Sequence, residues 1–284
     1  MKLLSLACVI LLIGCSCRYS ELLPDASEQP RWFLSSAPVP RGAFLVVHGL
    51  NQRPSAMEAL CRFLNALGFH AYRLTLSGHD RFSDETFPAS QWREDVARGA
   101  EEVQKRFPAL PLSMLGYSLG GLLTVDALDH DPNLSPQQLV LVAPALSLRT
   151  VVLAAKVLQL LPATSFRTAN FAPPGYRRFS GTPLFWYSNT ADIYDETRTL
   201  AHPQRLAAIP ALVLISPDDE LVSAPGVGEW IDENGLSARW KLELVGPQPA
   251  DPGLHRHLIV DEASVGRDEW RRMQQMIGEF LKGP

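Results

Sequence analysis

Residues 116–120 read Gly-Tyr-Ser-Leu-Gly, and this stretch decides the fold of the chain. An apolar run at residues 112–115 precedes it and a helix-compatible run at residues 119–128 follows it, so the pattern predicts a strand, a sharp turn and a helix. Glycine on both sides lets the strained backbone of such a turn approach its neighbours, which exposes the hydroxyl of Ser118 at the carboxyl end of the strand. Ser118 is therefore a candidate nucleophile.

The pentapeptide alone would also fit a serine in a flexible loop, so its context matters. Residues 42–50 form a second buried-strand pattern that runs into His-Gly, a turn that can aim backbone N–H groups at a developing oxyanion. Further along, the apolar residues 211–217 lead into Asp218 and Asp219, and His257 comes later still. The order serine, aspartate, histidine is that of the α/β-hydrolase fold and differs from the orders in chymotrypsin and subtilisin.

With these motifs the chain resembles the α/β-hydrolase superfamily, and within it the group of monoacylglycerol lipases, lysophospholipases and serine aminopeptidase-like proteins. The resemblance covers about residues 41–281, and four of the five motifs that recur in that group match. The fifth differs, because residues 78–80 are Gly-His-Asp where the group has Gly-His-Gly, which leaves the shape of that loop open. The stretch before residue 41 offers one candidate strand, at residues 32–35, where the family usually has two.

The resemblance implies the α/β-hydrolase fold: a mostly parallel, doubly wound α/β sheet with a helical lid inserted after the sixth strand. Continuous apolar runs of the kind found in parallel strands predict strands at residues 44–48, 72–76, 112–117, 139–142, 212–216 and 240–245. Helical periodicity predicts helices at residues 54–66, 91–105, 119–128, 226–234 and 268–281. Residues 41–284 would form the hydrolase domain, with the lid at about residues 146–208.

The lid segment is too long for a simple crossover and is rich in apolar residues. Residues 151–161 are nearly all apolar, and a helix that is apolar on most of its surface is buried or faces an apolar ligand. The aromatic residues that follow are Phe166, Phe171, Tyr176, Phe179, Phe185, Trp186 and Tyr187. They can form the core of a small cap or contact substrate, and an apolar cap over Ser118 would favour acyl chains and exclude water.

The N-terminus has the pattern of a secretion signal. Positive charge at Lys2 precedes an apolar core at residues 3–13, which is too short to span a bilayer as a helix. Residues 12–15, Leu-Ile-Gly-Cys, resemble the bacterial lipobox. That resemblance implies a lipoprotein signal peptide at residues 1–14, cleavage before Cys15, and lipidation of Cys15.

Diacylglycerol and a further acyl chain on Cys15 would anchor the protein stably to a membrane. Residues 15–40 would then be the lipidated N-terminus, a linker and the possible first strand. Ser16, where inner-membrane lipoproteins carry aspartate, favours sorting to the outer membrane, so the expected location is the bacterial cell envelope. The alternative is a plain cleaved signal with incidental cysteines.

Composition excludes other classes of function. A chain of 284 residues with 46% hydrophobic content can bury one large core, and a net charge of -4 gives no basic footprint for nucleic acid. No Cys/His spacing suggests a metal site, and no cofactor is expected. Cys61 lies in an amphipathic helical pattern and is expected to be buried, while its pairing with Cys17 stays open.

The resemblance also implies a role for each site residue. Ser118 would attack the acyl carbon, His257 would act as general base and then general acid, and Asp219 would orient the imidazole. The backbone N–H groups of Leu50 and Leu119 would hold the oxyanion.

Two of these positions have rivals, and further histidines match family turns. Asp218 precedes Asp219, but the Asp-x-x-Val spacing of the family matches Asp219. His255 precedes His257, but the apolar residues and the glutamate of the family motif follow His257.

His48 and His79 each match a family turn in which the ring hydrogen-bonds to backbone, so neither is assigned a catalytic role. His70, His130 and His202 lie in contexts that predict helix ends or loops, and they are expected to be solvated.

Three functions stay open. A carboxylic ester hydrolase for lipid or acyl substrates, such as a monoacylglycerol lipase or lysophospholipase, agrees with the apolar lid and the anchor. A serine peptidase or amidase of the same fold would need acidic groups for a substrate amine, and the candidates are Glu85, Asp192, Asp195 and Glu196. A non-catalytic binding lipoprotein would normally lack the nucleophile, the acid or the base, and all three are present here.

Overall fold

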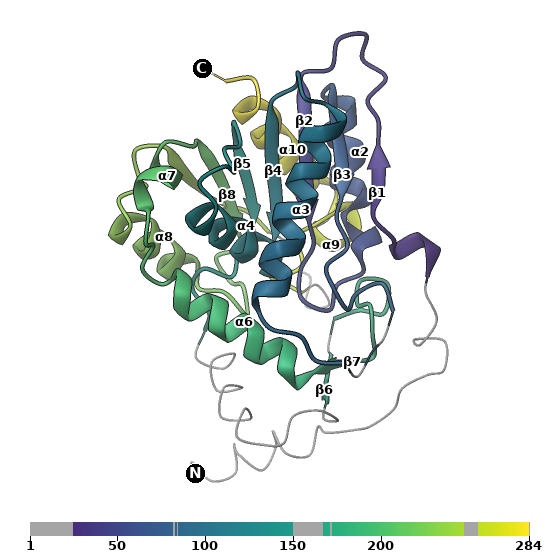
Figure 1. Ribbon diagram of the computed structural model, residues 1–284, viewed down its shortest axis with the longest axis vertical. Helices are drawn as coiled ribbons and strands as arrows, with labels where there is room; N and C mark the ends of the chain where they lie inside the picture. Colours follow the sequence, from purple (N-terminus) through teal and green to yellow (C-terminus); the bar gives the residue numbers. More distant parts are fainter. Residues whose placement is uncertain are drawn as a thin grey trace.

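The computed structural model describes residues 25–149 except 82 and 84, residues 167–246 except 171, and residues 255–283. A seven-stranded sheet in the order β1-β3-β2-β4-β5-β8-β9 runs through this part of the chain (Figure 1). β1 pairs antiparallel with β3, and the other neighbouring strands are parallel. The strands are β1 (Arg31–Phe33), β2 (Gly42–Val47), β3 (Phe69–Arg73), β4 (Leu112–Tyr117), β5 (Leu139–Val142), β8 (Ala211–Ile215) and β9 (Trp240–Leu244). The expected mostly parallel α/β sheet is confirmed.

Helices cover both faces of this sheet. Figure 1 shows α3 (Ser90–Arg106) and α4 (Leu119–His130) in front of it, and α2 (Glu58–Ala66) and α10 (Arg267–Phe280) behind it. The remaining helices are η2 (Ala26–Glu28), η3 (Pro54–Met57), α6 (Leu184–Thr197), α7 (Pro203–Ala207), α8 (Ala224–Glu233) and α9 (Glu262–Val265). Each of the five helices expected from periodicity is present to within about one turn.

Side chains on the two faces of the central strands pack into two separate hydrophobic cores. In β2, Leu45 and Val47 pack into the core beneath α3 and α4, whereas Phe44 and Val46 pack into the core beneath α2 and α10. Successive side chains of a strand point to opposite faces, so a strand buried on both sides reads as a continuous apolar run. This explains why β2 and β4 could be recognised from the sequence.

β3 lies three residues earlier than predicted, at Phe69–Arg73 in place of residues 72–76. Gly68, with φ +91°, ends the preceding helix and sends the chain directly into the strand, where Phe69 pairs with Gly42. Leu74 and Leu76 are buried beyond the strand, in the core that contains Trp92, and their apolar character misled the prediction.

The shift of β3 also corrects the expectation for His70, which is buried in the strand and not solvated. Its Nδ1 accepts a hydrogen bond from the backbone N–H of Ser35 at 3.0 Å, and its ring stacks on Phe107. Burial lowers the pKa of His70, with a further contribution from the positive charge of Arg106.

The long insertion leaves the sheet after β5, which is the fifth strand along the chain and not the sixth. Among the described residues one strand, β1, precedes residue 41, so the count is one lower than the expected fold implies. The described part of the insertion contains a two-stranded antiparallel sheet of β6 (Arg167–Ala169) and β7 (Gly181–Pro183), followed by α6 and α7. The apolar stretch at residues 151–161, Phe166 and Phe171 lie outside the described residues.

The predicted signal peptide, Cys15 and Cys17 also lie outside the described residues. Cys61 is fully buried in α2, as expected, and burial raises the pKa of its thiol to about 12. No helix within residues 25–283, so far as they are described, is both long enough and apolar enough to cross a membrane.

Candidate active site

The turn between β4 and α4 carries Ser118 in a strained conformation, with φ 53° and ψ -116°. A non-glycine residue with positive φ is uncommon and persists only where its surroundings enforce it. A Cβ on Gly116 would lie 2.5 Å from the carbonyl oxygen of Gly120, and a Cβ on Gly120 would lie 2.3 Å from that of Val47. Both glycines are therefore required for the close approach of strand and helix that exposes Ser118.

The order of the strands brings this turn next to the end of β2. β2 lies between β3 and β4, so the chain passes from β2 to β3 on one side and then crosses to β4 on the other. The carboxyl ends of β2 and β4 thus meet at a topological switch point, which is where open α/β sheets bind ligands. The His48-Gly49 turn and Ser118 follow these two strand ends.

Ser118, His257 and Asp219 form a continuous hydrogen-bonded chain. Nε2 of His257 lies 2.8 Å from Oγ of Ser118, and Nδ1 of His257 lies 2.8 Å from Oδ2 of Asp219. Asp219 is fully buried, and its other oxygen accepts hydrogen bonds from the backbone N–H groups of Leu221 and Val222, both at 2.8 Å. A carboxylate held in this way accepts the Nδ1 proton, which leaves Nε2 free to accept from the serine.

Two neighbouring side chains hold the backbone of His257. The hydroxyl of Tyr117 donates to the carbonyl of His257 at 3.2 Å, and a carboxylate oxygen of Glu220 accepts from the N–H of His257 at 2.9 Å. Burial raises the pKa of Tyr117 well above its usual range, and the nearby Asp219 adds to the rise. Tyr117 therefore stays a neutral donor.

The rival residues are placed differently. Asp218 is exposed, whereas the adjacent Asp219 points inward to His257. His255 is partly exposed, with its Nδ1 3.6 Å from the carboxylate of Glu220. The structure thus brings Asp219 and His257 to Ser118 and keeps Asp218 and His255 at the surface.

The backbone N–H groups of the turn after β2 are almost all used. Gly49 donates to Oε1 of Gln52, Asn51 to Nε2 of His79, and Gln52 to the carbonyl of Gly49. Arg53 donates to the carbonyl of Tyr176. The N–H of Leu50 has no acceptor among the described residues, and the same holds for the N–H of Leu119 at the start of α4.

His48 and His79 hydrogen-bond to backbone, as expected from their turns. Nε2 of His48 accepts from the N–H of Leu76, and Nε2 of His79 accepts from the N–H of Asn51, both at 3.1 Å. Burial lowers the pKa of His48 to about 4 and that of His79 well below its usual value. Both rings are therefore neutral near pH 7 and can act as acceptors.

Asn51, which the sequence did not single out, connects this turn to the insertion. It has φ 47°, its Oδ1 accepts from the N–H of Phe179, and its Nδ2 donates to the carbonyl of Phe179 and to Oγ1 of Thr182. The side chain thus pairs with the insertion as a neighbouring strand would. Asparagine's tolerance of positive φ is the one sequence signal that could have marked it.

Aromatic residues of the insertion pack over the loop that follows β3. Trp186 stacks on His79 with ring centroids 4.2 Å apart, and Phe185 packs edge-on against Phe87. Phe179, Phe185 and Trp186 are all buried. These three belong to the core beneath α3 and α4, so their burial fits a packing role for this insertion, called the cap below, and not contact with substrate.

Asp80 stands where the resembled group has glycine, and a residue of the insertion holds the loop that contains it. The guanidinium of Arg178 donates to the backbone carbonyls of His79, at 2.8 Å, and of Asp80, at 2.6 Å. The loop at residues 78–80 is thereby tied to the cap through its carbonyl groups, whatever side chain stands at position 80.

One group of three potential metal ligands occurs within the described residues, namely Asp126, His130 and Glu196. Arg93 occupies the middle of this group, with its guanidinium donating to both oxygens of Asp126, at 2.5 and 2.9 Å, and to Glu196. An arginine already pairs with both carboxylates, so the group fits an ion-pair network better than a metal site.

Comparison with known proteins agrees with the fold. Residues 38–178 match the family model described as serine aminopeptidase, S33. The structure is similar to a soluble variant of monoglyceride lipase from Saccharomyces cerevisiae, with a TM-score of 0.70 and 14% identity over 89% of this chain and 90% of that one. It is also similar to the monoacylglycerol lipase of Paleococcus ferrophilus, with a TM-score of 0.64 and 18% identity over 89% and 97% of the two chains.

The strand order and these structural similarities show that the chain has the α/β-hydrolase fold. Its sequence is similar to human monoglyceride lipase, with 30% identity over 132 residues. The matched part covers 43% of this chain and 43% of the human protein, so it spans less than half of that relative.

Proposed function

We propose that the protein is a serine hydrolase that cleaves carboxylic esters of lipid or acyl substrates through an acyl-enzyme. The observation that carries this proposal is the chain of two 2.8 Å contacts from Ser118 through His257 to the buried Asp219, beside the N–H groups of Leu50 and Leu119. A nucleophile, a base and an orienting carboxylate in this geometry are the parts that acyl transfer needs.

In the proposed mechanism, His257 takes the proton of Ser118 as the serine oxygen attacks the carbonyl carbon. The negative charge that develops on the carbonyl oxygen is held by the N–H groups of Leu50 and Leu119, each such donor contributing about 3 to 4 kcal/mol. His257 then protonates the leaving alcohol, and afterwards activates a water molecule that hydrolyses the acyl-enzyme. Asp219 keeps the imidazole in the required tautomer and stabilises its cation.

A lipid or acyl substrate is supported by the similarity to monoglyceride lipases. Human monoglyceride lipase and the two structurally similar lipases are all named as lipases of monoacylglycerols.

We also propose that the protein is a lipoprotein of the bacterial cell envelope, anchored through Cys15 and directed to the outer membrane. The proposal is supported by the Leu-Ile-Gly-Cys sequence at residues 12–15 after a short apolar core. Expression of the full chain in a bacterium should place it in the membrane fraction, and Cys15→Ala should release it or leave the precursor uncleaved. A wild-type chain that takes up no labelled palmitate, or a processed wild-type chain that is absent from the membrane fraction, would contradict the anchor.

The proposed activity is tested by hydrolysis of p-nitrophenyl esters from acetate to palmitate, with the full chain in detergent micelles. We expect turnover that rises with acyl chain length and disappears in Ser118→Ala. A preference for acetate would contradict the lipid substrate class. If all esters fail while aminoacyl amides are cleaved in a Ser118-dependent way, the protein is a peptidase or amidase instead.

A further inference from the structure

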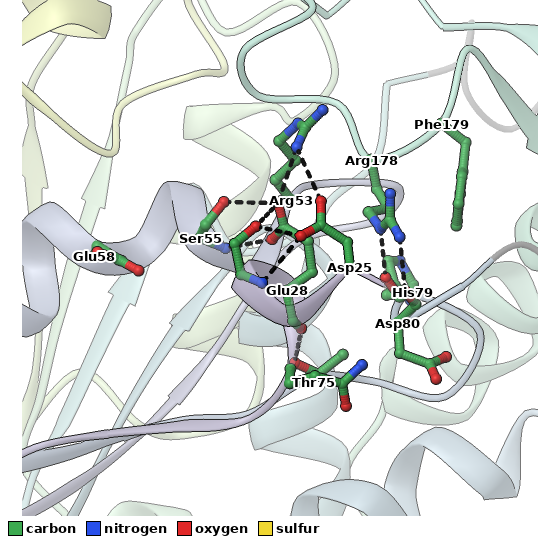
Figure 2. Close-up of polar contacts among 12 residues, drawn as sticks. Asp25, Glu28, Arg53, Ser55, Glu58, Thr75, His79, Asp80, Arg178 and Phe179 are labelled. Atoms are coloured by element: carbon green, nitrogen blue, oxygen red, sulfur yellow. Dashed lines mark hydrogen bonds and ion pairs between the residues drawn. The ribbon is translucent and has the colours of Figure 1, made fainter. Parts of the chain in front are cut away.

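We propose that Glu28, a residue of the N-terminal segment, is a positioning residue for the turn at residues 49–53 that presents the Leu50 N–H. The inference rests on the proposed function, because it concerns the oxyanion donor of that mechanism. Glu28 belongs to η2, a single 3-10 turn that lies far from this turn in sequence but contacts Arg53 and Ser55 in space (Figure 2).

Glu28 is a fully buried carboxylate with a complete set of donors. Its Oε1 accepts from Nη1 of Arg53 at 3.0 Å and from Oγ of Ser55 at 2.9 Å, and its Oε2 accepts from the backbone N–H of Ser55 at 2.9 Å. Figure 2 shows these three bonds converging on one side chain. A carboxylate buried in this way is costly unless each oxygen is satisfied, so its direction is tightly defined.

The carboxylate is not needed to dock the N-terminal segment on the domain. Nη2 of the buried Arg73 donates to the backbone carbonyls of Ser27 and Gln29, at 2.6 and 2.7 Å, and Oγ1 of Thr75 donates to the carbonyl of Glu28 at 2.6 Å. These bonds fasten the backbone of the segment to the end of β3. The side chain of Glu28 adds bonds to Arg53 and Ser55, the residues where the turn ends.

The backbone of the same turn is held by the cap. The N–H of Arg53 donates to the carbonyl of Tyr176 at 2.7 Å, and the N–H of Arg178 donates to the carbonyl of Asn51 at 2.8 Å. The guanidinium of Arg53 also lies 3.9 Å from the carboxylate of Asp25. The turn is thus fixed between the N-terminal segment and the cap, with Leu50 at its tip.

Replacement of Glu28 by glutamine tests the proposal, because the amide keeps the size of the side chain and presents an N–H₂ group to donors. We expect kcat of Glu28→Gln for p-nitrophenyl esters to fall about tenfold with KM within twofold, since full loss of an oxyanion donor lowers kcat by about 10²- to 10³-fold. The rate at which a fluorophosphonate labels Ser118 should fall by a similar factor, because its P=O group uses the same donors.

Glu58→Gln is the matched control. Glu58 also accepts from a buried arginine, Nη1 of Arg73 at 2.9 Å, but it lies on α2 and makes no hydrogen bond to the turn among the described residues. Both variants should lower the melting temperature, and kcat per labelled serine should fall in Glu28→Gln alone. An unchanged kcat in a folded Glu28→Gln variant, or an equal fall in both, overturns the proposal.

Two further arms keep the test decisive. If Glu28→Gln does not fold, Ser55→Ala removes one donor and keeps the ion pair, and a kcat indistinguishable from the wild type overturns the proposal. If the wild type hydrolyses no ester, the proposed function fails, and the labelling rate of Ser118 still distinguishes Glu28→Gln from Glu58→Gln.

Discussion

The elbow around Ser118 and the turn at residues 49–53 follow the ends of neighbouring strands, but they are held in different ways. Ser118 is positioned by backbone groups: Gly116 and Gly120 allow the close approach, and the serine N–H donates to the carbonyl of Val142 while the N–H groups of Gly121, Leu122 and Ala145 donate to its carbonyl. The turn is positioned by side chains from distant segments, among them Glu28 and His79. A nucleophile can therefore be recognised from five residues of sequence, whereas the side chains that hold an oxyanion donor come from several distant segments.

The largest expected effect is at the elbow itself. Ser118→Ala should lower ester turnover by about 10⁴-fold or more, because the nucleophile is lost. Its melting temperature should be close to that of the wild type, since no buried contact of the core is removed. Residual turnover within tenfold of the wild type, measured by active-site titration and kcat, would show that another group attacks the substrate.

The next largest effect is expected at Asp219, and the adjacent Asp218 provides its control. Asp219→Asn should lower kcat by about 10⁴-fold, because the amide disturbs the tautomer of His257. Asp218→Asn should leave kcat within about twofold of the wild type, since Asp218 is exposed and lies away from the imidazole. The reverse result, in a kinetic comparison of the two purified variants, would exchange their roles.

Gly120→Ala tests the contact between the elbow and the end of β2, because the added Cβ would lie 2.3 Å from the carbonyl oxygen of Val47 and 2.7 Å from that of His48. We expect a loss of about 3 kcal/mol in the free energy of unfolding, measured by denaturant titration. Gly175→Ala is the control: nothing lies within 4 Å of its Cβ, so the change should be about 0.5 kcal/mol or less. Equal effects would show that the elbow is not closely packed.

The smallest expected effect is a pH dependence of the free energy of unfolding, caused by the buried histidines near the turn. The folded-state pKa of His48 is about 4, below its usual 6.5, so the unfolded chain takes up a proton first as pH falls. The contribution of neutral His48 to the free energy of unfolding is complete above about pH 6.5 and is lost progressively toward pH 4. About 2 kcal/mol of it is lost at pH 5. His79, whose pKa is also lowered by burial, should add to the loss.

Denaturant titrations at pH 7 and pH 5 measure this dependence directly. His48→Gln cannot bind the proton and should flatten the slope between these values. A slope that is the same in the wild type and in His48→Gln would assign the acid sensitivity to other groups.

Much of the fold could be predicted because buried parallel strands are apolar on both faces and helices repeat at a fixed period. The prediction was wrong where apolar residues were buried outside the sheet, as Leu74 and Leu76 are. α6 was not predicted, because its buried residues include the polar Asn189, Thr190 and Thr197, which hide its periodicity.

The sequence by itself determined the order of the candidate nucleophile, acid and base, because each lies in a short motif whose local geometry is set by neighbouring residues. The tertiary structure alone decided which residues hold the turn at residues 49–53. Glu28, Asn51 and Arg178 come from segments far apart in the chain, and their roles depend on hydrogen bonds that exist only after the sheet, the cap and the N-terminal segment have come together. No local pattern encodes such contacts, since their direction is set by packing over the whole domain.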